Sequence, residues 1–232
     1  MSLSYRALAL LLSYPTEQTR ALMSDAAAVL GADPRIPAPI RSALAKLAVD
    51  VKSGDLFDVQ EAYVWLFDRT RSLSLNLYEH VHGESRDRGQ AMVALLELYR
   101  SKGLELSANE LPDHLPVFLE FLSTLPDDEA SSLLAEAGHV LHALGERLHR
   151  RGSAYRAVFG ALAALAAEEA DGQVLAAMLA EPDDDPRDLA TMDRLWAESA
   201  VTFGPSEAGC DERQALERPA VRPQRAHGGA AA

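Results

Sequence analysis

Apolar residues recur at steps of three and four along most of this chain, which is the spacing of an amphipathic helix. The clearest stripe comprises Leu133, Leu134, Ala137, Val140, Leu141, Leu144 and Leu148. Similar stripes run through residues 3–13, 22–30, 40–51 and 155–165. No segment alternates apolar and polar residues between hairpin turns, as a strand would. The pattern therefore predicts an all-α protein: a single irregular compact bundle of roughly eight to ten helices.

Proline, glycine and capping residues divide these stripes into separate helices. Tyr14-Pro15 ends the first helix, Thr16 caps the second, and Gly54 closes the third. Pro126 and the aspartates after it begin a long helix that we expect to continue without a break to Leu148.

The central stretch from Glu61 to Leu125 carries the most unusual sequence. Its first part, from Tyr63 to Val81, places apolar residues on one helical face and predicts one long helix that ends at Gly83.

Two further helices are expected after this one. Asp87 and Gln90 have the spacing of a capping box, so the next helix should start there and run to Gly103. Asp113 is a good N-cap for the third helix, and Pro116 would then lie in its first turn, where a missing N–H costs little.

This stretch also carries a family resemblance. The run LYEHVHGESRDRGQAMV, followed by LPDHLPVFLEFL, resembles the NarJ-type redox-enzyme maturation chaperones and, more broadly, the TorD/DmsD-type chaperones. The segment TMDRLWAESAVTFGP is similar to the C-terminal part of the same family. The resemblance implies a TorD-like helical fold over residues 1–203, and residues 204–232, which are rich in Pro, Gly, Ala and Arg, should form a disordered tail.

The resemblance also implies a function that is binding rather than catalysis. The expected partner is the apo form of the catalytic (alpha) subunit of respiratory nitrate reductase, recognised partly through its N-terminal segment. The chaperone would keep that subunit competent for insertion of the molybdenum cofactor and the iron–sulfur cluster before membrane docking. The cofactor-insertion machinery is a further possible partner, and no cofactor is expected in the chain itself.

Seven residues are candidates for the client-peptide surface. They lie in the charged junction between the first two central helices and at the start of the third: His82, Glu84, Ser85, Arg86, Arg88, Asp113 and His114. The alternative interpretation is structural, because the same charges could simply hold two helices at a fixed angle. Asp113 in particular could serve only as an N-cap.

The charge balance limits the classes of partner. The chain has 35 Asp and Glu against 22 Lys and Arg, a formal net charge of −13. Such a surface repels nucleic acid and anionic lipid, and it favours a basic amphipathic peptide, although acidity also serves solubility alone.

Cysteine usage and the N-terminus bear on the compartment. Cys210 is the single cysteine, so an intrachain disulfide or a cysteine-based metal site is impossible. The first 15 residues lack a basic leader and are too short to span a bilayer. We therefore expect a cytoplasmic protein.

Enzymatic alternatives find little support. Nucleotide-binding glycine motifs and the G-x-S-x-G motif are absent. A carboxylate-bridged di-metal enzyme remains as an alternative, because Glu-x-x-His occurs at Glu79/His82, Glu136/His139 and Glu146/His149. Such a site needs pairs on different helices, and two of these pairs are expected to share one. The acidic segment from Glu181 to Pro186 is interpreted as a solvated helix cap rather than a cation site.

Overall fold

The computed structural model describes residues 2–83, 85–106, 110–167 and 172–180. All of them belong to one unit of the chain, Met1–Met192, whereas the second unit is Asp193–Ala232. Outside the described residues lie the predicted domain boundary at 203/204, the segment 181–186 and Cys210.

The described part of the chain is helical and contains no β-strand, which confirms the all-α prediction. Its helices are α1 (Leu3–Leu12), α2 (Glu17–Ala21), α3 (Met23–Ala32), α4 (Ala38–Ser53), α5 (Leu56–Tyr63), α6 (Leu77–His82), α7 (Arg86–Ser101), α8 (Leu115–Leu122), α9 (Asp127–Glu136), α10 (Gly138–Arg150), α11 (Arg156–Leu165) and α12 (Gly172–Ala180). These are twelve helices rather than eight to ten, because several predicted helices are split.

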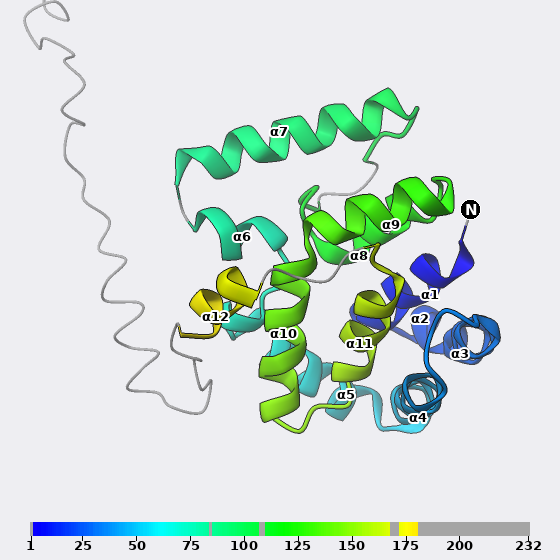
Figure 1. The fold of residues 1–232 in the computed structure, drawn as a ribbon. Helices are drawn as coiled ribbons and strands as arrows, with labels where there is room; N and C mark the ends of the chain where they lie inside the picture. Colours follow the sequence, from blue (N-terminus) through cyan, green and yellow to red (C-terminus); the bar gives the residue numbers. More distant parts are fainter. Residues whose placement is uncertain (1, 84, 107–109, 168–171, 181–232) are drawn as a thin grey trace, which may run out of the picture. The chain divides into compact units, whose positions relative to one another are not determined.

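The first helix lies at the centre of the packing. α1 packs against α3, α8 and α11, and its Leu8, Leu11 and Leu12 are almost completely buried. A second group forms where α10 packs along α11 and also contacts α12 (Figure 1). One continuous set of buried apolar side chains joins the two groups, as expected for a single hydrophobic core.

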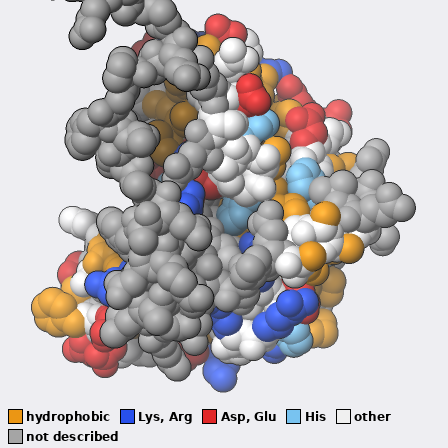
Figure 2. Space-filling view, turned by 90° about the vertical axis from the view of Figure 1, so that its left-hand side faces the viewer, with side chains coloured by type: hydrophobic (Ala, Val, Ile, Leu, Met, Phe, Trp, Pro, Cys, Tyr) orange, Lys and Arg blue, Asp and Glu red, His pale blue; other side chains and the backbone are white. Residues whose placement is uncertain are grey.

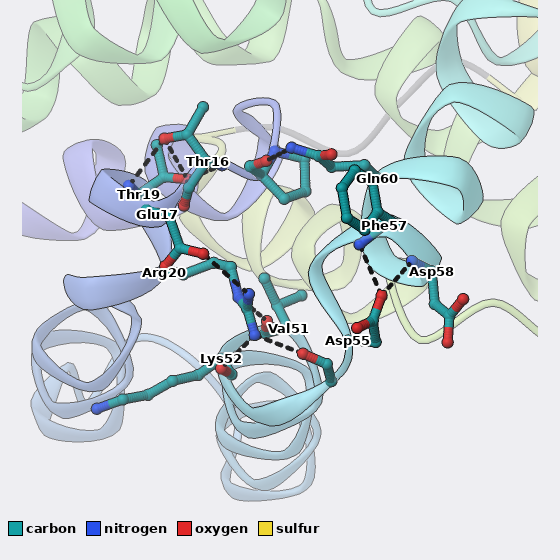
Figure 3. A network of polar contacts seen from close by, with 12 residues as sticks. Thr16, Glu17, Thr19, Arg20, Val51, Lys52, Asp55, Phe57, Asp58 and Gln60 are labelled. Atoms are coloured by element: carbon teal, nitrogen blue, oxygen red, sulfur yellow. Dashed lines mark hydrogen bonds and ion pairs between the residues drawn. The ribbon is translucent and has the colours of Figure 1, made fainter.

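A polar network fixes the ends of α2, α4 and α5 (Figure 3). Thr16 and Thr19 form a reciprocal capping box at the start of α2, which confirms the cap predicted at Thr16. The Arg20 guanidinium donates to the carbonyl oxygens of Val51, Lys52 and Gly54 at the C-terminal end of α4. These carbonyls have no partner inside the helix, so one arginine satisfies two of the last carbonyls of α4 and that of its C-cap, Gly54.

Two predicted helices are interrupted. The helix expected after Thr16 ends at Ala21, and α3 begins at Met23. The helix expected from Pro126 to Leu148 was also wrong as a single element, because it breaks at Ala137 between α9 and α10. The break allows α9 to pack against α8 while α10 packs along α11 and α12.

The long helix predicted from Tyr63 to Val81 is wrong as well. After α5 the chain forms a π-helix at Val64–Asp68 and a 3-10 turn at Arg71–Leu73, and α6 begins only at Leu77. The Thr70 hydroxyl donates to the carbonyl of Trp65 at 2.9 Å, which satisfies part of the loosened turn. Gly83 ends α6 as predicted, with a φ of 55° that L side chains rarely adopt.

Candidate functional site

The segment between the 3-10 turn and α6 lies against the segment that leads into α8. The Leu115 N–H donates to the carbonyl of Leu75 at 2.8 Å, and the Leu77 N–H donates to the carbonyl of Asp113 at 3.0 Å. Asn76 and His114 thereby form an isolated antiparallel bridge. The two segments satisfy each other's backbone groups, and this explains why the apolar pattern does not continue as one helix.

Asp113 is completely buried and does not cap α8. Its Oδ2 accepts the backbone N–H of Tyr78 at 3.1 Å, in the first turn of α6, while His114 occupies the N-cap position of α8. The predicted N-cap role for Asp113 was therefore assigned to the wrong helix. Pro116 does lie in the first turn of α8, as predicted.

Arg88 connects α7 to this buried carboxylate. Its NH2 group lies 3.1 Å from Glu79 Oε1 and 3.7 Å from Asp113 Oδ2. Asn76 also donates to Glu79 Oε1, at 3.2 Å. We call Glu79, Arg88 and Asp113 the junction network, because they join α6, the start of α7 and the segment before α8.

Electrostatics of the junction network favour the ionised form of Glu79. Burial alone would raise the pKa of this carboxyl, but hydrogen bonds from Ser74 and Asn76 and the Arg88 guanidinium outweigh burial and lower the pKa. Arg88 Nε and Asp113 Oδ1 are buried and have no hydrogen-bond partner within the described structure.

The remaining predicted site residues have different surroundings. The His82 ring packs edge-on against the Tyr78 ring, with centroids 5.7 Å apart. Ser85 occupies the N-cap position of α7 without a side-chain hydrogen bond to the helix, so the capping box predicted at Asp87 and Gln90 is wrong.

The last three predicted site residues are Glu84, Arg86 and His114. Arg86 is the first residue of α7, and Glu84 lies outside the described residues. His114 Nδ1 lies 3.4 Å from Glu110 Oε2, close enough for an ion pair but without hydrogen-bond alignment.

A cavity of about 350 Å³ opens beside the junction network, and we call it the α7 cavity. Most of its lining is apolar: Leu77, Tyr78, Val81, Ala94, Leu95, Leu98, Phe118, Leu133, Ala137 and Val140, with Glu136 and His139 as the polar members. These residues come from α6, α7, α8, α9 and α10 and from Ala137 between the last two.

Sequence reasoning did not identify the α7 cavity. Val81 was expected on the apolar face of one long helix, but the structure leaves it 51% exposed. Its neighbours in the cavity come from helices that are distant in sequence, so only the folded chain brings them together.

Helix α7 forms its wall of this cavity with few buried residues of its own. Among the residues of this helix whose burial the structure describes, Leu95 and Tyr99 are the buried ones, and Val93 is 55% exposed. In Figure 1, α7 lies at the outside of the arrangement, beyond α8 and α9. Because α7 buries so little surface of its own, we infer that contacts at its ends hold it in place. The junction network makes these contacts at its first turn, through Arg88.

The three Glu-x-x-His pairs do not assemble a metal site in the described part of the chain. Glu79/His82 lies on α6 and Glu146/His149 on α10, whereas Glu136 and His139 fall on different helices because of the break at Ala137. No group of three or more His, Cys, Asp or Glu that could hold a metal ion occurs among the described residues.

Charge is unevenly distributed over the face shown in Figure 2. Lys and Arg side chains gather at its lower right, and Asp and Glu side chains lie toward its upper right and lower left edges.

Among the described residues, no helix combines the length and the apolar character needed to cross a bilayer.

Comparison with known proteins identifies the family. Residues 33–161, which include α4 to α10 and the junction network, match the family described as nitrate reductase delta subunit. The chain belongs to the nitrate reductase delta subunit family.

Curated relatives of this family extend the match over most of the chain. The chain is 40% identical to the nitrate reductase molybdenum cofactor assembly chaperone NarJ of Escherichia coli K12, over 87% of this chain and 85% of that protein. It is also 40% identical to the probable assembly chaperone NarW of the same organism, over 89% and 86%. The probable chaperone NarJ of Bacillus subtilis is 29% identical, over 66% and 82%.

These relatives confirm the predicted resemblance to NarJ-type chaperones. The Escherichia coli relatives are named as assembly chaperones, which supports a chaperone role for this chain over the di-metal enzyme alternative.

Proposed function

We propose that this chain is a cytoplasmic chaperone that binds the apo catalytic subunit of a respiratory nitrate reductase, including its N-terminal segment. The observation that carries the proposal is the α7 cavity, an apolar recess whose outer wall is a helix with little buried surface of its own. The names of the relatives, which are nitrate reductase molybdenum cofactor assembly chaperones, supply the client class.

The cavity suits one or a few apolar side chains of an amphipathic segment. Tyr78, Val81 and Leu98 offer apolar contact, and apolar anchors in a recess contribute most of the affinity in such interfaces. Glu136 is exposed at the same cavity, where its carboxylate would attract a basic residue of the client and set its orientation.

The junction network would act by positioning α7, not by contacting the client. Arg88 and Asp113 hold the first turns of α7 and α6 together, and their burial leaves little surface for a peptide. Glu84, Ser85 and Arg86, together with His82 and His114, stay candidates for direct contact with the client.

Binding without catalysis is sufficient for the proposed role. A client held at its N-terminal segment would stay competent for insertion of molybdenum cofactor and iron–sulfur cluster and would dock on the membrane subunit only after release. The machinery that inserts the cofactor is then a further partner of the complex.

Titration of a labelled peptide from the N-terminus of the nitrate reductase catalytic subunit tests this proposal. Ala94→Trp should fill the cavity from its exposed position on α7 and weaken binding by about tenfold or more. Ala45→Trp, at an exposed position of α4, is the matched control and should change binding by less than about twofold.

Equal affinity of both variants would show that the client does not use this cavity. If tagged catalytic subunit also fails to copurify with the unaltered chain, the chaperone proposal itself is wrong.

A further inference from the structure

A second apolar cavity, of about 290 Å³, lies between the segment after α7 and the outer face of α8. We call it the α8 cavity. It is lined by Arg6, Tyr99, Leu104, Glu105, Leu106, Glu110, Val117, Glu120, Phe121, Ser123 and Thr124. The two cavities have no lining residue in common, although α7 and α8 contribute residues to both.

The floor of the α8 cavity is apolar and is held rigidly. Val117 and Phe121 are one helical turn apart on α8 and so lie on the same face. Tyr99 is buried and its hydroxyl donates to the carbonyl of Pro112 at 2.7 Å, while its ring packs on Phe121 with centroids 4.5 Å apart. Leu104 and Leu106 are half-buried against the same core.

The rim is acidic. Three of the lining residues are glutamates, against one arginine, and all four are exposed. The carboxylates of Glu105 and Glu120 make no hydrogen bond or ion pair with any residue that the structure describes, and Glu110 Oε2 lies 3.4 Å from His114 Nδ1. Carboxylates spaced around an apolar recess complement a ligand that has an apolar anchor between positive charges.

We propose that the α8 cavity is a second docking surface, which takes a basic amphipathic segment of a partner protein: one apolar side chain on the Val117–Phe121 floor, with Lys or Arg side chains toward Glu105, Glu110 and Glu120. The volume admits one or two large side chains, so the surface suits a short segment rather than a folded domain. This site goes beyond the proposed function and does not depend on the α7 cavity.

A fluorescent helical peptide composed only of leucine and lysine at amphipathic spacing is the probe, titrated against the full chain by anisotropy at low salt. Glu120→Lys should weaken its binding by about tenfold, because it places a like charge against the lysines of the peptide. Asp50→Lys, at an exposed position of α4, makes the same change in net charge and should weaken binding by less than about twofold. Equal weakening by both variants would mean that the acidic surface attracts the probe without a site, and would overturn the proposal.

Occupancy of the apolar floor is tested separately. Val117→Trp adds bulk at a half-buried position on the outer face of α8 without changing the charge. It should also weaken binding of the probe peptide by about tenfold. Unchanged binding by Val117→Trp would overturn the proposal even if Glu120→Lys acts as expected. Ala94→Trp in the α7 cavity should leave the binding of this probe unaltered. The two assays therefore distinguish failure of the α8 cavity proposal from failure of the proposed client site in the α7 cavity.

Discussion

The buried carboxylate of Asp113 accepts the backbone N–H of Tyr78 across 35 positions of sequence, at 3.1 Å. A side chain from the segment before α8 thus caps the first turn of α6. Negative charge at a helix N-terminus is favourable, since the first N–H groups of a helix have no partner within it. The same carboxylate lies 3.7 Å from Arg88, so helix capping and the placement of α7 depend on one residue.

Removal of this carboxylate should therefore destabilise the fold. Asp113→Ala leaves the Tyr78 N–H unsatisfied and takes one partner from the mostly buried Arg88, and we expect a loss of about 3 kcal/mol in the free energy of unfolding. Denaturant melts measure the change, with the exposed Asp50→Ala as a control that should cost less than about 0.5 kcal/mol. A cost no larger than that of the control would mean that the junction network contributes nothing to stability.

Two glycines beside this network should respond in opposite directions to the same substitution. Gly83 has a φ of 55°, so Gly83→Ala should cost about 1–2 kcal/mol even though no atom lies within 4 Å of the new Cβ. Gly89 lies inside α7, also with open space around it, and Gly89→Ala should stabilise by about 0.5–1 kcal/mol. Thermal or denaturant midpoints of the two variants should thus move apart, and a shift of both in one direction would contradict the assigned backbone conformations.

Arg147 is expected to hold α12 to the body of the helices. It is 2% exposed and donates to the carbonyls of Ser72 and Met178, at 2.9 and 2.7 Å. Lysine keeps the charge but lacks the forked geometry, so Arg147→Lys should cost about 2–3 kcal/mol and speed hydrogen exchange in α12. Arg150→Lys, on the exposed side of the same turn, should change neither quantity measurably, because its partner Glu146 is also partly exposed. Normal exchange in α12 of Arg147→Lys would show that other contacts hold this helix.

Asp33 should make the fold sensitive to acid. Hydrogen bonds from the Arg35 side chain lower the pKa of its carboxyl well below the ordinary range; burial opposes this effect, and the hydroxyl of Ser4, at 2.6 Å, adds to it. Because the folded-state pKa is depressed, the stabilisation is fully present above the unfolded pKa of about 4 and is lost as the pH falls below it.

The variant Asp33→Asn tests this dependence. The difference in unfolding free energy between the unaltered chain and Asp33→Asn should be constant above about pH 5 and shrink below about pH 4. Melts in urea over this pH range provide the measurement. A difference that grew on acidification would reverse the sign and refute the role of the ionised carboxylate.

Local signals in the sequence determined the fold class and many of the helix ends. Apolar spacing predicted a helical chain, the cap at Thr16 marked the start of α2, and Gly54 and Gly83 marked helix ends correctly. Each of these features depends on residues within about one helical turn of each other, so the chain needs no distant partner to express it. The family resemblance in the LYEHVHGESRDRGQAMV run is local in the same sense.

Only the tertiary structure decided where the central helix breaks and what its charged junction does. The backbone of residues 75–77 pairs with residues 113–115 rather than with its own helical turn, and no pattern within residues 61–83 records that partner. For the same reason the sequence places Asp113 as an N-cap of the helix that follows it, whereas in the structure its carboxylate caps α6. The contacts of Arg88 with both Glu79 and Asp113 likewise arise only in the folded chain. The α7 cavity draws its lining from five helices, and the distances between them are set by packing of the core rather than by spacing along the chain.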